Sequence, residues 1–205
     1  MKTVIFALVL LGMGEIAGRT NADLMGRKSQ DPRRDAAAIQ VFLQNVDRYV
    51  TLRTEAASTI PAARAFDPWA FLFRVEKLSE AIRARRSDAR VGDIFTFEVR
   101  IALRAIIDRS ICAQGLTADE VIRGIEEETV PGALPPAINK PFPWQFEAMM
   151  PPYLLAHLPK LPRGIQYRIV GRDLVLIDLE STLVVDILRE ALNQSSTTRP
   201  TATSS

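Results

Sequence analysis

The sequence contains few of the residues from which catalytic and metal-binding sites are usually built. Among its 205 residues it has one cysteine, Cys112, and one histidine, His157. A single cysteine cannot form an intramolecular disulfide, so the fold must be stable without one. A single histidine with no cysteine, histidine or carboxylate at ligand spacing cannot hold a metal ion unaided. The sequence therefore predicts no disulfide, no metal site and no cofactor.

Motifs and charge narrow the function classes further. The sequence has no glycine-rich phosphate loop, no nucleophile elbow and no paired-cysteine motif. Its 26 basic and 24 acidic residues give a formal net charge of +2, which does not indicate a nucleic-acid partner. Because 47% of the residues are hydrophobic, the chain can form one domain with a sizeable core.

The N-terminus has the pattern of a secretory signal peptide. Lys2 precedes an apolar run over residues 4–13, and small residues follow at Thr20 and Ala22. This run is too short for a membrane-spanning helix, which needs roughly twenty residues, and no later segment is apolar enough. We expect cleavage after Ala22 and export to the periplasm or the extracellular space, with membrane contact only through the export signal. The alternative is an uncleaved N-terminal anchor.

The part that follows the signal is predicted to be helical. Hydrophobic residues recur at steps of three and four. Asp31-Pro32 and Asp67-Pro68 are helix-start pairs, and residues 117–120 form a capping-box pattern. Gly115 is placed to end a helix. We predict a bundle of helices over residues 33–56, 68–86, 97–113 and 118–127, the second having an apolar face broad enough for a central helix.

A proline-rich connector over residues 130–163 follows the helices. Its prolines exclude a long helix or an inner strand, and one short helix, residues 152–158, fits within it. Its apolar residues must be buried, so we expect the connector to be ordered and to pack on the helical bundle as a strap. The aromatic and methionine content of residues 142–150 would alternatively line a groove for a peptide or a lipid.

Three β-prone runs, residues 165–170, 174–178 and 183–188, predict a small antiparallel meander. The second run is almost wholly apolar and should be the middle strand. The alternative prediction for the last run is a helix over residues 181–192. Residues 23–30 and 193–205 are polar and predicted to be disordered. The expected fold class is α+β, a single domain over residues 31–192.

Several polar residues have both a functional and a structural interpretation. Asp178 and Asp186 lie on neighbouring predicted strands, as a hydrolytic carboxylate pair would, but turn-flanking and edge-strand roles are commoner. Cys112 is expected to be buried, and His157 to be partly exposed on the short helix. The arginines of residues 83–90 and the glutamates of residues 126–128 are expected to be solvated helix ends rather than an anion-binding surface or a calcium site.

A binding groove, if the chain has one, is expected where the connector meets the meander. The candidate binding residues there are His157, Tyr167, Arg168 and Trp144.

Four stretches resemble a group of uncharacterised exported bacterial proteins. They are the break at residues 92–96, the proline-rich run at 150–162, the meander sequence at 167–178 and the Val-Val-Asp close at 184–186. Phe97 departs from the group, which has a helix-starting proline there. The closing hairpin is also similar to the small C-terminal sheet of nickel and cobalt homeostasis proteins, without metal ligands. The resemblance implies export and this layout, and no activity.

These observations favour an exported, soluble, non-enzymatic protein that serves as a binding or interaction module of the cell envelope. Its partner would be an unknown protein or another envelope component, bound for example by strand addition at an exposed edge of the meander. The alternative is a hydrolase or transferase whose site assembles from dispersed residues such as His157, Asp178 and Arg168.

Overall fold

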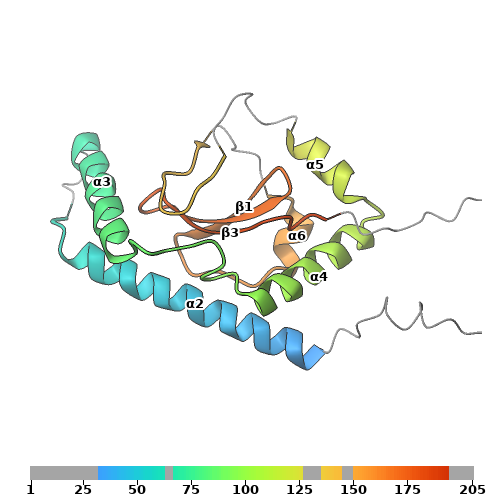
Figure 1. Ribbon diagram of the computed structural model, residues 1–205. Helices are drawn as coiled ribbons and strands as arrows, with labels where there is room; N and C mark the ends of the chain where they lie inside the picture. The colour runs from blue at the N-terminus through green and yellow to red at the C-terminus, as the bar shows by residue number, and fades with distance from the viewer. Residues whose placement is uncertain (1–31, 63–66, 127–134, 145–149, 194–205) are drawn as a thin grey trace, which may run out of the picture. The chain divides into compact units, whose positions relative to one another are not determined.

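The structure is a computed structural model that describes residues 32–62, 67–126, 135–144 and 150–193 (Figure 1). All of these belong to one compact unit that begins at Pro32. The predicted signal peptide, leader and C-terminal tail lie outside the described residues. So do residues 127–134 and 145–149, which include part of the glutamate run and of the connector.

The described elements confirm the predicted α+β class. Five helices precede a three-stranded antiparallel sheet in which β2 is the middle strand. The last run is a strand, so the competing helix over residues 181–192 is wrong. The helices are α2 (Pro32–Ser58), α3 (Pro68–Arg85), α4 (Phe97–Ala113), α5 (Ala118–Glu126) and α6 (Pro152–His157), and the strands are β1 (Ile165–Val170), β2 (Asp173–Asp178) and β3 (Val184–Leu188).

Helix boundaries follow the local signals in the sequence. Asp67 Oδ1 accepts hydrogen bonds from the backbone N–H groups of Trp69 and Ala70, at 3.0 and 3.1 Å, and so caps α3. At the start of α5 the Thr117 backbone N–H donates to Glu120 Oε2 at 2.7 Å, and Thr117 Oγ1 accepts from the Glu120 N–H at 3.2 Å. This is the reciprocal geometry of a capping box. Thr96, which directly precedes α4, makes no side-chain capping bond.

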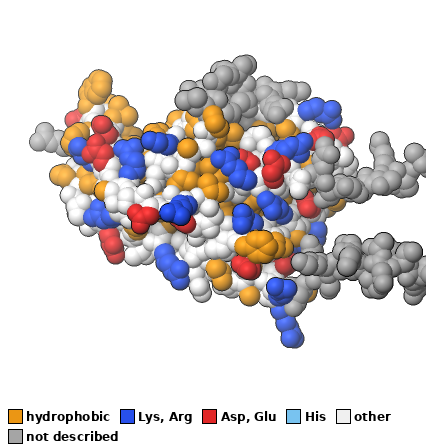
Figure 2. All heavy atoms as spheres, viewed as in Figure 1, with side chains coloured by type: hydrophobic (Ala, Val, Ile, Leu, Met, Phe, Trp, Pro, Cys, Tyr) orange, Lys and Arg blue, Asp and Glu red, His pale blue; other side chains and the backbone are white. Residues whose placement is uncertain are grey.

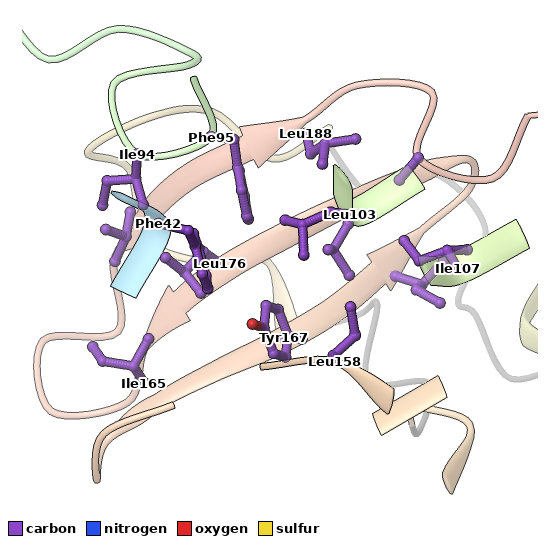
Figure 3. Packing of buried hydrophobic residues seen from close by; sticks show 14 of the residues in the cluster. Phe42, Ile94, Phe95, Leu103, Ile107, Leu158, Ile165, Tyr167, Leu176 and Leu188 are labelled. Carbon is purple, nitrogen blue, oxygen red and sulfur yellow. The ribbon is translucent and has the colours of Figure 1, made fainter. Parts of the chain in front are cut away.

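The helices share one core with the inner face of the sheet. Phe42 of α2 stacks on Phe95 and on Tyr167 of β1, with ring centroids 5.5 and 6.3 Å apart. Leu176 of the middle strand and Leu103 of α4 belong to the same cluster of buried residues. Figure 3 shows these side chains pointing from the helices and the sheet toward one another. The four predicted helices therefore do not enclose a core of their own.

The outer face of the sheet is covered by the proline-rich connector. Phe142, 2% exposed, packs with Val175 and Ile177 of β2 and Ile187 of β3, and Ile138 packs beside them. The prediction that the strap packs on the helical bundle is therefore wrong for this part of the connector. The physical reason is that β2 is apolar on both faces, so its outer side chains also need cover.

The connector also pairs with the edge of the sheet at the start of β3. The Asn139 N–H donates to the Val184 carbonyl at 3.0 Å, and the Val184 N–H donates to the Lys140 carbonyl at 2.9 Å. The Phe142 N–H donates to the Thr182 carbonyl at 2.7 Å. These bonds occupy backbone groups that an added strand would need, so this stretch of edge is not open to strand addition.

Helix α3 is not the central helix that its apolar face predicted. Only its second half enters the core, through Leu78 and Ile82. The first two turns leave Trp69 80% exposed and Phe71 60% exposed. Periodicity identifies residues that share a face, but it does not show whether another element covers that face.

Candidate functional site

Asp178 is a fully buried carboxylate at the end of β2. Its Oδ1 accepts from Arg53 Nη1 at 3.1 Å and from the Glu180 N–H at 2.9 Å. Its Oδ2 accepts from the Tyr49 hydroxyl and from Ser181 Oγ, both at 2.8 Å. Burial, together with the negative charge of Asp178, raises the pKa of Tyr49 well above its usual range. The carboxylate thus fastens the helix α2 to the turn after β2.

Asp186 on β3 is a second fully buried carboxylate with a different set of donors. Its oxygens accept from the backbone N–H groups of Gly92, Ile94, Phe95 and Ile187, at 2.7 to 2.8 Å. Burial raises the pKa of the Asp186 carboxyl above its ordinary value, and the four N–H donors oppose that rise. Asp186 therefore holds the loop between α3 and α4 against the sheet.

These two carboxylates do not form a catalytic pair that faces solvent. Both are 0% exposed, and each has four donors of its own. Among the described residues, every buried polar side-chain atom has a hydrogen-bond partner. The geometry gives Asp178 the turn-flanking role expected of it, and it gives both residues a structural role in tying distant segments together.

The four predicted binding residues lie on different surfaces. Tyr167 is buried on the inner face of the sheet, where its hydroxyl donates to the Pro159 carbonyl at 3.1 Å and burial raises its pKa. Arg168 follows it on β1 and so points to the opposite face. Trp144 is 38% exposed and stands edge-on to Phe142, with ring centroids 5.3 Å apart. The structure therefore does not bring all four residues to one groove.

The single histidine and the single cysteine are both exposed. His157 lies on α6, and its Nδ1 is 2.7 Å from the Tyr153 carbonyl one turn earlier. Cys112 is also exposed, so its predicted burial is wrong. The core side of α4 at this point is taken by Ile111 and Ser110, and Cys112 is rotated about 100° from Ile111 around the helix. Within the described residues, no group of three potential ligands is placed to hold a metal ion.

Among the arginines of residues 83–90, which were expected to form a solvated helix end, Arg85 and Arg90 are exposed and Arg86 packs against the rest of the domain. Arg86 Nη2 donates to the Val185 carbonyl at 3.1 Å, and its guanidinium lies 5.0 Å from the centre of the Tyr49 ring. Arg86 also borders a shallow hollow of about 240 Å³ together with Arg85, Asp88, Ala89 and Asp93. Because charges of both signs line this open hollow, it has no clear preference for an anion or a cation.

The most exposed apolar surface of the described residues is at the start of α3. We call Trp69, Phe71, Leu72 and Phe73 the apolar tip; their exposed fractions are 80%, 60%, 56% and 55%. Hydrophobic side chains gather at the same end of the helix in Figure 2, at the upper left. Isolated exposed hydrophobic residues are common on soluble proteins, whereas a contiguous group marks an interaction site.

Basic side chains accompany the apolar tip. Lys77 Nζ lies 5.6 Å from the centre of the Phe73 ring and 2.7 Å from Glu80 Oε2. Arg74 Nη1 donates to the carbonyls of Ile60 and Pro61, at 3.0 and 2.9 Å.

The sequence showed that the residues of the tip are apolar. No local signal in the sequence distinguished an exposed helix face from a buried one.

Comparison with models of protein families, with curated proteins and with solved structures finds no match. Within the described residues, no helix combines the length and hydropathy that crossing a membrane requires.

Proposed function

We propose that the protein is an exported, non-enzymatic binding module of the cell envelope, which binds its partner through the apolar tip of α3. The observation that carries the proposal is the exposure of Trp69, Phe71, Leu72 and Phe73 on two consecutive helical turns. Exposed apolar area costs roughly 25 cal/mol per Å² relative to burial. A partner that covers the tip recovers this free energy.

The second half of α3, which continues from the apolar tip, is fixed to the rest of the domain. Ser79 Oγ donates to the Ser181 carbonyl at 2.8 Å, and Leu78 and Ile82 are buried beside it. Because the second half of α3 is fixed in this way, little conformational entropy is lost when the first half binds. A surface that is held in its binding conformation suits a recognition element.

The proposal of a non-enzymatic role is supported by the engagement of the polar residues in the core. Asp178 would have to reach solvent to act with His157 and Arg168 in a hydrolase or transferase, yet its side chain is 0% exposed and bonded to four donors. The proposal of export is supported by the N-terminal pattern of Lys2, the apolar run and the small residues up to Ala22.

The test combines mass analysis with photo-crosslinking in cells. We expect mature protein that lacks the first 22 residues, in an envelope or extracellular fraction. A photoreactive phenylalanine analogue that replaces Trp69 should give discrete adducts of protein or lipid. The same analogue at Phe97, 63% exposed on α4, is the matched control and should not. Full-length protein confined to the cytoplasm would refute export, and equal adduct patterns at the two positions would refute binding through the tip.

A further inference from the structure

We draw no further inference here: the strongest candidate, the exposed apolar tip at the start of α3, belongs to the site already described, and nothing in the structure shows what covers it.

Discussion

The buried carboxylate Asp178 provides the sharpest test of how the fold is held together. Asp178→Asn keeps the shape of the side chain but replaces one oxygen with an NH₂ group. Four donors face the carboxylate in the native protein, two on each oxygen. The amide retains one acceptor oxygen, so two donors lose their partner. The guanidinium of Arg53 also loses the nearer and fully buried of its two carboxylate partners, and keeps only the half-exposed Glu180, whose Oε1 lies 3.5 Å from Arg53 Nη1.

The magnitude follows from the burial of the pair. The side chains of Arg53 and Asp178 are 7% and 0% exposed, so solvent does not screen the loss. Removing one partner of a buried ion pair costs about 3–5 kcal/mol, out of a total unfolding free energy of about 5–15 kcal/mol for a typical domain. For a chain of this size we expect the melting temperature of the variant to fall by about 6–20 °C.

Urea denaturation followed by circular dichroism measures the effect, with an exposed ion pair as the control. Lys77 and Glu80 are closer, at 2.7 Å, but their side chains are 43% and 46% exposed. Glu80→Gln should therefore leave the denaturation midpoint unchanged within error. Adding Arg53→Met to Asp178→Asn should recover part of the lost stability, because no uncompensated buried charge remains. If Asp178→Asn costs no more than Glu80→Gln, the reasoning is wrong.

Three other predictions test particular sites. Burial raises the pKa values of Tyr49 and Tyr167 above the ordinary tyrosine value of about 10. The stability that the two protonated tyrosines contribute is fully present below about pH 10, and the free energy of unfolding falls by about 1.4 kcal/mol per tyrosine for each pH unit above it. Urea titrations and phenolate absorbance would show this fall. Gly164→Ala should lower the free energy of unfolding by about 2–4 kcal/mol, because φ is +85° and the new Cβ would lie 2.7 Å from the buried guanidinium of Arg53. As a control, Gly124→Ala should stabilise the protein slightly, because Gly124 lies in a helix and its new Cβ would have no atom within 4 Å. Cys112 is exposed, so a thiol reagent should label it in the native protein at a rate comparable to that in denaturant; protection would contradict this placement.

The elements were predictable where the signal is local. Asp67 before Pro68 sets the start of α3, and the pattern from Thr117 to Glu120 sets the start of α5, because each cap is satisfied within three residues. Gly171, at φ +57°, forms the turn between β1 and β2. The apolar sequence of β2 placed it in the middle of the sheet.

What the sequence did not show depends on distant contacts. The donors to Asp178 from α2 lie 125 and 129 residues earlier in the chain, and nothing near Asp178 identifies them. The available signal for these buried carboxylates was a charged residue next to apolar strand residues: Asp178 ends β2, and Asp186 lies inside β3. The exposure of Trp69 and the cover that Phe142 provides for the sheet depend on packing, which periodicity alone does not determine.

Asp178 and Asp186 lie far along the chain from most of the groups that donate hydrogen bonds to them. This separation has a consequence for the order of folding. Chain synthesis delivers Arg53 and Tyr49 early, and their partner Asp178 arrives only with β2, 125 and 129 residues later. Until then α2 has a cation and a hydroxyl without their acceptor, and the loop from Gly92 to Phe95 lacks the carboxylate that holds it. Contacts between residues so far apart in the sequence form slowly, and only after the chain that contains both residues is present. A growing chain therefore cannot close either set of contacts until β2 and β3 have been synthesised.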